Sequence, residues 1–215
     1  MSGAQEIIRP LIAQDIPQVA EIFCEQFPNL SLTRLGRNFI RRLVRWHFEK
    51  HPHLSFVAEG DNQVVGFIIG ATGGHREYYR QVLHFAFPEF LLGSLLHPWL
   101  FLKPGFLRLW LEFLRDVRSI RTTPDKIGLS KSGEKKAIIS FVAVTDAAQE
   151  RGIGTRLKQT FEEAAFQAGI EVLSSYTEIN NYAARRLNEK CGWTQVREDT
   201  HHKMVYFSRR LDKDL

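Results

Sequence analysis

The part of the chain that most constrains its fold is an apolar run at residues 137–144, which leads through a short turn into an amphipathic helix. The turn contains Gly152 and Gly154. The helix then carries apolar residues three or four positions apart: Ile153, Leu157, Phe161, Ala164, Ala165 and Ala168. The first amides of a helix have no partner within it and carry the positive end of its dipole, and glycine, having no Cβ, lets an anion approach them closely. The segment therefore predicts a strand, a turn and a helix start that together bind a diphosphate.

Two common diphosphate-binding motifs fit this segment badly. A dinucleotide-binding loop has a third glycine where this chain has Leu157, and an acidic residue about twenty positions on, which only Glu171 or Glu178 could supply. A nucleoside-triphosphate P-loop ends in Gly-Lys-Ser or Gly-Lys-Thr, and the sequence contains neither tripeptide. We therefore expect neither a Rossmann domain nor a P-loop domain.

Three separate stretches resemble the GCN5-related N-acetyltransferases (GNAT family). The pattern Gln-x-x-Gly-x-Gly at 149–154 is similar to motif A of that family. Residues 181–193 are similar to its Asn-x-x-Ala … Lys-x-Gly-Phe signature, with tryptophan in place of phenylalanine, and residues 7–19 are similar to its first strand and helix. The resemblance covers residues 5–72 and 136–208. It implies an enzyme of α/β (α+β) class, whose central mixed, mostly antiparallel sheet is flanked by helices and whose co-substrate is acetyl-CoA.

The resemblance also implies which residues hold acetyl-CoA. Main-chain groups at the end of the central strand would hold the pantetheine arm, the amides of the turn and helix start would hold the pyrophosphate, and Asn181 would hydrogen-bond the arm. The implied set is Val142, Ala143, Val144, Gln149, Glu150, Arg151, Gly152, Ile153, Gly154, Thr155 and Asn181. We expect direct transfer of the acetyl group in a ternary complex, because neither cysteine stands in a reactive setting, and we expect no metal.

Acetyl transfer to an amine needs a base, because an alkyl ammonium with a pKa near ~10 must first lose a proton. A backbone amide of the central strand can stabilise the oxyanion, and the departing CoA thiolate benefits from a proton donor. Where many family members carry a tyrosine as that donor, this chain has Asn188, which is not an acid. The proton could instead come from water, Tyr176 or Tyr182, or the thiolate departs unprotonated. Tyr176 and Glu178 are also candidates for a base or for ordering water; a packing aromatic and a helix-start charge are the plain alternatives.

The remaining elements follow from periodicity and turn residues. Strands are predicted at about 6–10, 54–59, 63–70, 170–177, 194–197 and 203–208. Helices are predicted after Asp15, whose side chain would cap the first of them, over 33–50 and over 180–191. Glycines at 169 and 192 would end the last two helices of the chain. This order is typical of one sheet with helices packed on it.

Residues 73–135 stand where relatives normally have a tight turn. We interpret them as a helical, aromatic-rich insertion in a single domain of residues 1–215, because long structureless loops are uncommon in compact domains. One apolar face would contain Tyr78, Tyr79, Val82, Leu83, Phe85 and Phe87, and another Leu107, Leu109, Trp110, Leu111, Phe113 and Leu114. The uncharged run 90–102 is shorter than the about twenty residues that a membrane span needs. A lid over the acceptor, a dimer interface, contact with a membrane surface and an extension of the core all stay open.

Composition limits the class of protein without fixing it. The chain has 215 residues, of which 44% are hydrophobic, and a formal net charge of +5, which is weak evidence for any anionic partner. Two cysteines are too few for a disulfide framework, and the polar start lacks the pattern of a signal peptide, so we expect a cytoplasmic protein. Three histidines at 47, 51 and 53 lie close together, but no cysteine or acidic residue has metal-site spacing with them.

The acceptor follows least directly from the sequence. We expect a primary amine on a small or amphipathic molecule, an amino sugar for example, since the insertion would obstruct an open peptide groove. We expect no nucleic acid, while a homodimer and contact with a membrane surface through the insertion stay open. Two alternatives remain: a peptide or protein N-acetyltransferase, and a CoA-binding sensor without turnover, which Asn188 motivates.

Overall fold

The computed structural model describes residues 6–30, 32–75, 77–78, 80–82, 84–85 and 133–211. The chain divides into two compact units, Met1–Thr72 with Lys126–Leu215, and Gly73–Asp125. In the second unit the described residues from 75 to 85 are helical, and the Tyr78 N–H donates to the Gly74 carbonyl at 2.9 Å. The predicted apolar face from 107 to 114, the run 90–102 and part of the first apolar face lie outside the described residues.

A seven-stranded sheet forms the first unit, in the order β1-β2-β3-β4-β5-β7-β6. The strands are β1 (Ile7–Pro10), β2 (Ser55–Gly60), β3 (Gln63–Thr72), β4 (Lys136–Val144), β5 (Val172–Glu178), β6 (Thr194–Asp199) and β7 (Met204–Arg210). Among these described strands only β4 and β5 run parallel, and every other neighbouring pair is antiparallel. The predicted mixed, mostly antiparallel sheet is confirmed.

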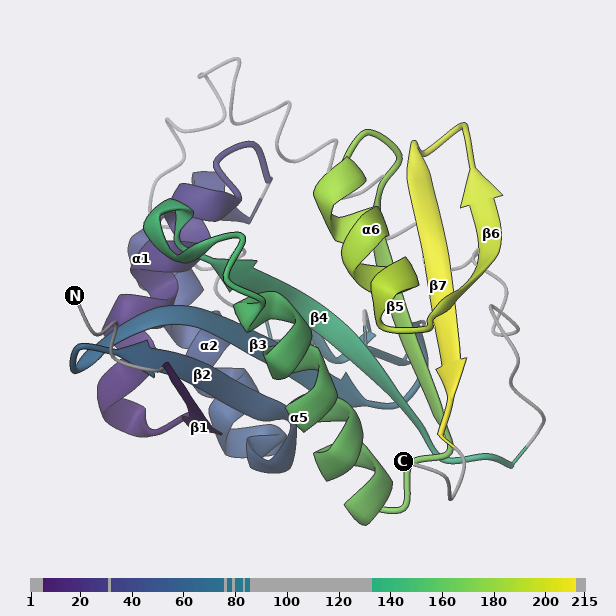
Figure 1. Cartoon of the computed structure of the whole chain (residues 1–215), viewed down its shortest axis with the longest axis horizontal. Coiled ribbons are helices and arrows are strands. Elements are labelled where there is room, and N and C mark those ends of the chain that lie inside the picture. Colours follow the sequence, from purple (N-terminus) through teal and green to yellow (C-terminus); the bar gives the residue numbers. More distant parts are fainter. Residues whose placement is uncertain are drawn as a thin grey trace. The chain divides into compact units, whose positions relative to one another are not determined.

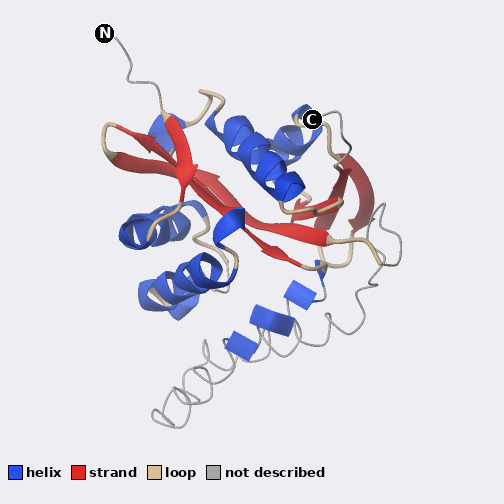
Figure 2. Ribbon diagram, turned by 90° about the horizontal axis from the view of Figure 1, so that it is seen from below, coloured by secondary structure: helices blue, strands red, loops and turns tan. Residues whose placement is uncertain are grey.

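Helices cover both faces of this sheet (Figures 1 and 2). Helices α1 (Ile16–Gln26) and α2 (Arg37–Lys50) lie on one face, and α5 (Ile153–Gln167) and α6 (Tyr182–Lys190) lie on the other. Phe23 of α1 packs against Phe67 of β3 and Phe141 of β4, with ring centroids 6.3 and 4.7 Å apart. On the opposite face the predicted apolar stripe of α5 enters the core: Ile153, Leu157, Phe161 and Ala165. A helix stripe on each side therefore removes both faces of the central strands from water.

Local turn chemistry explains where several elements begin and end. The hairpin between β2 and β3 turns at Asp61 and Asn62, whose φ angles of 51° and 60° match the turn type that suits the twist of a two-residue hairpin. Helix α5 ends just before Gly169 and α6 just before Gly192, as the sequence predicts.

Two local expectations were wrong. The Asp15 side chain does not cap α1, because its carboxylate instead accepts from the Ile12 N–H at 2.9 Å and pairs with the Arg9 guanidinium at 2.6 Å. A charged partner binds a carboxylate more strongly than a neutral helix amide does. The helix predicted over 33–50 is interrupted by Gly36, whose φ of 93° lies outside the helical region, so α2 begins at Arg37.

The contact between α5 and β3 can be tested at Gly70. A Cβ at this position would lie 2.5 Å from the Phe161 ring and from the Ile138 carbonyl oxygen. We expect Gly70→Ala to lower the free energy of unfolding by about 2 kcal/mol, as overpacking of a filled core does. In the control Gly60→Ala, the new Cβ would lie 3.3 Å from the flexible Glu6 side chain and at ordinary contact distance, 3.7 Å or more, from Val65. Denaturant unfolding of both variants measures the difference, and equal stabilities would contradict the packing of α5 on β3.

Candidate active site

Strands β4 and β5 pair over only part of their length. Their parallel register joins Lys136, Ala137 and Ile138 to Val172, Leu173 and Ser174. Beyond these residues the two strands diverge, and among the described strands none pairs with β4 on that side from residue 139 to 144 (Figure 1). We call this divergence the splay. It leaves one edge of the central strand without partners from the sheet.

The main-chain groups that face the splay follow from the strand's alternation. The Thr145 N–H donates to the Val65 carbonyl of β3 at 2.9 Å. Successive residues of a strand point their N–H and C=O groups to opposite sides, so those of Ala143 point to β3, whereas those of Val142 and Val144 point to the splay. The Val144 carbonyl indeed accepts from Gln149 Nε2 at 3.1 Å and not from a strand. Val142 and Val144 can therefore offer hydrogen bonds to an extended ligand.

The turn between β4 and α5 carries a run of free amides. Glu150 and Gly152 have φ angles of 64° and 77°, with Arg151 between them outside the left-handed region. The first hydrogen bond of α5 runs from the Arg156 N–H to the Gly152 carbonyl at 3.1 Å. In the described part of the chain, the N–H groups from residue 150 to 155 have no acceptor. Alternating backbone of this kind at a helix start forms a concave anion site, and we call residues 150–155 the cradle.

The two glycines of the cradle serve different needs. Gly152 takes a φ of 77°, and a Cβ there would meet nothing within 4 Å, so its backbone conformation is what favours glycine. Gly154 lies inside the first turn of α5, and a Cβ there would stand 3.3 Å from Leu187 of α6. Gly154 therefore also lets the two helices approach each other, a role that the motif did not reveal.

Side chains next to the cradle hold its backbone in place. Gln149 Nε2 donates to Val144 O and also to Asp146 Oδ1 at 3.0 Å, so this side chain braces the turn. Arg151 donates to the Ala147 carbonyl at 2.8 Å. Arg156 donates to the Glu6 carbonyl at 2.7 Å and pairs with its carboxylate at 2.8 Å. The backbone N–H of Glu6 and the Arg156 guanidinium, both hydrogen-bonded to the Glu6 carboxylate, lower the pKa of this carboxyl.

Asn181 takes the position that starts α6. Its Oδ1 accepts from the Ala184 N–H at 3.0 Å, which is the ordinary bond of a helix cap. The Asn181 side-chain amide is then the group left to reach a pantetheine arm.

The predicted catalytic residues lie on opposite faces of the sheet. Val205 and Phe207 of β7 belong to the core beneath α5, so their neighbour Tyr206 projects to the other face, the one that α1 and α2 cover. Tyr176 pairs directly with Tyr206, their ring centroids lying 6.3 Å apart, and Glu178 follows two residues later at the exposed end of β5. Tyr176 and Glu178 thus share the α1 face.

Asn188, in contrast, lies on the α5 face and has a partner that sequence reasoning missed. Its Oδ1 accepts from Lys158 Nζ of α5 at 2.5 Å, and its Nδ2 donates to the Ala184 carbonyl at 2.9 Å. Lys158 is only 1% exposed, and its Nζ stands 3.7 Å from the centre of the Trp193 ring. Burial lowers the pKa of this lysine to about 7. A lysine four residues before Glu162 looks like an exposed ion pair in sequence, so no local signal predicts its burial.

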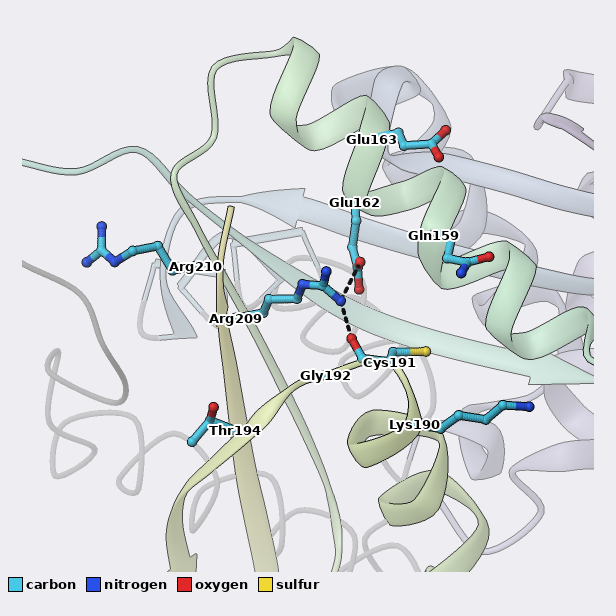
Figure 3. A pocket seen from close by; sticks show the side chains of 9 residues that line it. All are labelled: Gln159, Glu162, Glu163, Lys190, Cys191, Gly192, Thr194, Arg209 and Arg210. Carbon is cyan, nitrogen blue, oxygen red and sulfur yellow. Dashed lines mark hydrogen bonds and ion pairs between the residues drawn. The ribbon is translucent and has the colours of Figure 1, made fainter. Parts of the chain in front are cut away.

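Further polar groups continue from Trp193 toward the surface. Trp193 Nε1 donates to Glu162 Oε1 at 2.6 Å, while Glu162 Oε2 pairs with Arg209 at 3.0 Å. Figure 3 shows Arg209 between Glu162 and the Cys191 carbonyl, to which it also donates. These three residues line an open pocket of about 640 Å³, together with Gln159, Glu163, Lys190, Gly192, Thr194 and Arg210. Lys158 is not part of its wall.

The described residues suit neither a metal site nor a membrane-spanning segment. No group of three or more His, Cys, Asp or Glu side chains within them is arranged to hold a metal ion. None of the helices in the same residues is long and apolar enough to cross a membrane.

Comparison with known proteins agrees with this geometry. Residues 105–193 match the model of the acetyltransferase (GNAT) family. SsHAT has a similar structure, with 17% identity, a TM-score of 0.65, and coverage of 97% of this chain and 100% of that chain. The ribosomal-protein-alanine N-acetyltransferase from Brucella melitensis is also 17% identical, with a TM-score of 0.56 and coverage of 95% and 99%. A chain of the NatC complex bound to Gag peptide and CoA is 12% identical, with a TM-score of 0.57 and coverage of 95% and 96%.

Among curated proteins no sequence match is found. The identities to solved structures are low, so the structural likeness concerns the fold, and the sequence match to the family is confined to residues 105–193. That match includes both the cradle and α6, which are the elements beside the splay. Residues 105–193 are therefore similar in sequence to the GNAT acetyltransferase family, and the described residues have the fold of solved N-acetyltransferases.

Proposed function

We propose that this protein transfers an acetyl group from acetyl-CoA to a primary amine on a small or amphipathic acceptor, in one step within a ternary complex. The observation that carries the proposal is the coincidence of two free main-chain surfaces at one end of β4. Among the residues that the structure describes, the edge of β4 along the splay has no strand partner, and the cradle that follows it has no acceptor for its amides. An extended ligand with a diphosphate at one end satisfies both.

The residues present fit such a ligand. The amides of the cradle would hold the pyrophosphate, and the splay-facing groups of Val142 and Val144 would hold the pantetheine arm. Ala143, whose main-chain groups point to β3, would not bond the arm and would contribute by keeping Val142 and Val144 at their positions along the strand. Acetyl-CoA supplies an activated acetyl thioester, and a splay-facing amide of β4 is placed to stabilise the oxyanion that forms on its carbonyl.

The acceptor amine and the base that deprotonates it would lie on one face of the sheet. The acceptor would approach from the α1 face, where Tyr176 and Glu178 project. A phenol with an ordinary pKa near ~10 is protonated at neutral pH, whereas a carboxylate is already a base. We therefore assign removal of the amine proton to Glu178, directly or through water, and contact with the acceptor to Tyr176.

The acceptor class separates the proposal from its closest alternative. The ribosomal-protein-alanine enzyme and the peptide-bound NatC complex are named for protein or peptide acceptors. The preference for a small acceptor rests on the sequence alone: residues 73–135 stand between β3 and β4, where the resembled family has a tight turn. A peptide acceptor is thus the alternative enzyme, and a CoA-binding sensor, motivated by Asn188, is the alternative without turnover.

The cradle can be tested without straining the fold, by a charge at Thr155. This residue lies in the first turn of α5, where a negative charge stabilises the helix. We expect Thr155→Glu to raise the Kd for CoA by a factor of about 10 or more through repulsion of the pyrophosphate, and to leave the melting temperature unchanged or higher. Thr155→Gln is the matched neutral control. Calorimetric titration measures both, and equal CoA affinity in the two variants would remove the cradle from the proposal.

The base can be tested by following free thiol with acetyl-CoA and a panel of amines. We expect Glu178→Gln to lower kcat by a factor of about 100, the usual contribution of a positioned base, with unchanged CoA affinity. Glu198→Gln, an exposed change on β6, serves as control. An equal kcat in the two variants would overturn the assignment of Glu178.

The same panel tests the acceptor class, because it includes amino sugars, simple alkyl amines and peptides with a free N-terminus. We expect thiol release with the small amines. Release with peptides alone would favour the alternative enzyme, and CoA binding without release for any amine would favour the sensor.

A further inference from the structure

The Lys158–Asn188 pair is a buried polar contact that neither the cradle nor the base explains. Asn188 stands where the sequence resemblance places a tyrosine acid, and an amide cannot donate a proton to the departing thiolate. The pair is inside the protein, with Lys158 1% and Asn188 4% exposed. Burying a lysine is costly, so its retention between α5 and α6 calls for a reason.

We propose that Lys158 is a positioning residue that acts through Asn188 to hold a positive charge beside the CoA sulfur as the thioester breaks. This inference rests on the proposed function and names the device that stabilises its leaving group. Lys158 donates to Asn188 Oδ1, which polarises the side-chain amide, and the ammonium and the polarised amide together face a developing negative charge.

The pair lies along the path that the pantetheine arm would follow. Helices α5 and α6 lie on the same face of the sheet, with α6 over β5 (Figure 1) and α5 against β2, β3 and β4. The first turn of α5 meets α6 at Gly154 and Leu187, and the next turn meets it at Lys158 and Asn188. Lys158 is therefore about 6 Å farther along α5 than Gly154, in the direction that leads away from the cradle.

The orientation of the Asn188 amide is fixed on both sides. Its Nδ2 must face the Ala184 carbonyl, because a carbonyl can only accept a hydrogen bond. Its Oδ1 must face Lys158 Nζ, because a protonated amine has hydrogen bonds to donate and cannot accept any. Lys158 thus holds Asn188 in one orientation. Replacement of either residue removes the constraint on the other.

The charge of Lys158 is not neutralised locally. The groups that face it are Glu162 of its own helix, Cys191 and Trp193 after α6, and Arg209 of β7. Both Glu162 oxygens have other partners, Trp193 Nε1 and Arg209. Within the described residues no carboxylate lies at ion-pair distance from Lys158 Nζ, whose hydrogen bond goes to a neutral amide. An ammonium in this setting is available to a new anion.

The chemical step balances with this device. The neutral amine attacks the thioester carbon, the C–S bond breaks, and its electron pair stays on sulfur as a thiolate. Lys158 keeps its proton and stabilises the thiolate by charge, and the thiolate takes a proton from water when CoA leaves. The proton lost by the amine passes to Glu178, or to the water beside it, and then to solvent.

The direct test is the pKa of the CoA thiol when CoA is bound, followed by the absorbance of the thiolate as the pH is raised. A free thiol has a pKa of about 8.5. We expect the wild-type protein to lower the pKa of the bound thiol, and Lys158→Met to return it upward by about one unit, a factor of 10 in the ionisation constant. Asn188→Leu should raise the pKa of the bound thiol by a similar amount. The double variant should raise it no further than either single variant does, because the pair acts as a unit.

Two further variants guard against a change of fold. Lys190→Met replaces an exposed lysine at the end of α6 and should leave the bound thiol as in the wild type. Lys158→Arg keeps a charge that does not titrate, and should preserve the lowered thiol pKa. The melting temperature of each variant shows whether it is folded.

The pH profile of turnover provides a readout that a merely structural lysine would not change. Because the pKa of Lys158 is about 7, this lysine loses its charge as the pH rises through that value. The kcat of the wild type, corrected for the fraction of acceptor amine that is neutral at each pH, should therefore fall over the same range. Lys158→Met should lower kcat by a factor of about 10 to 100 below this pH and lack the fall, with the Kd for CoA changed less than about threefold.

The outcomes distinguish this inference from the proposed function. A wild-type protein that binds no CoA overturns both. Bound CoA whose thiol titrates alike in the wild type and in folded Lys158→Met overturns this inference alone, and leaves the cradle and the base as they stand. Loss of CoA binding in Lys158→Met with an unchanged thiol pKa in Asn188→Leu would likewise contradict it.

Discussion

The rest of the structure depends on the incomplete pairing of β4 with β5. Both strands are central, and backbone groups inside a protein need hydrogen-bond partners. Their ladder stops after Ile138 and Ser174, so the remaining edge of β4 lies open on its way to the cradle. Within the described part of the chain, this edge and the amides of the helix start have no partners, and they form one continuous main-chain surface. A ligand that binds this surface would be recognised by main-chain conformation more than by side-chain identity.

In the proposed reaction, the sheet would also separate two kinds of chemistry that would interfere with each other. Proton removal from an amine needs a base, and the candidates Tyr176 and Glu178 project from β5 on the α1 face. Departure of a thiolate is helped by positive charge, and Lys158 lies with Asn188 on the α5 face. A carboxylate and an ammonium on the same side would pair with each other. Placed on opposite faces of one sheet, each can act on its own end of a substrate that lies between them.

The sequence predicted the parts of this arrangement that are local. The cradle is fixed by adjacent residues, and the strand and helix on either side follow from periodicity, so its position and backbone form were predictable. The missed features depend on residues far apart in the chain. Asp15 pairs with Arg9 and does not cap α1, Gly154 makes room for Leu187, and Lys158 reaches Asn188, thirty positions away. The substitution of tyrosine by Asn188 was visible in the sequence, but its lysine partner was not, because only the packing of α5 against α6 brings the two together.

The most direct measurement of the central claim is a titration of the backbone amide resonances with CoA by nuclear magnetic resonance. The account predicts that the largest shifts occur in the amides of residues 150–155 and in Val142 and Val144, with a smaller shift in Ala143, whose N–H is bonded to β3. Shifts concentrated instead around Lys190, Gly192 and Arg209, in the pocket of Figure 3, would contradict it.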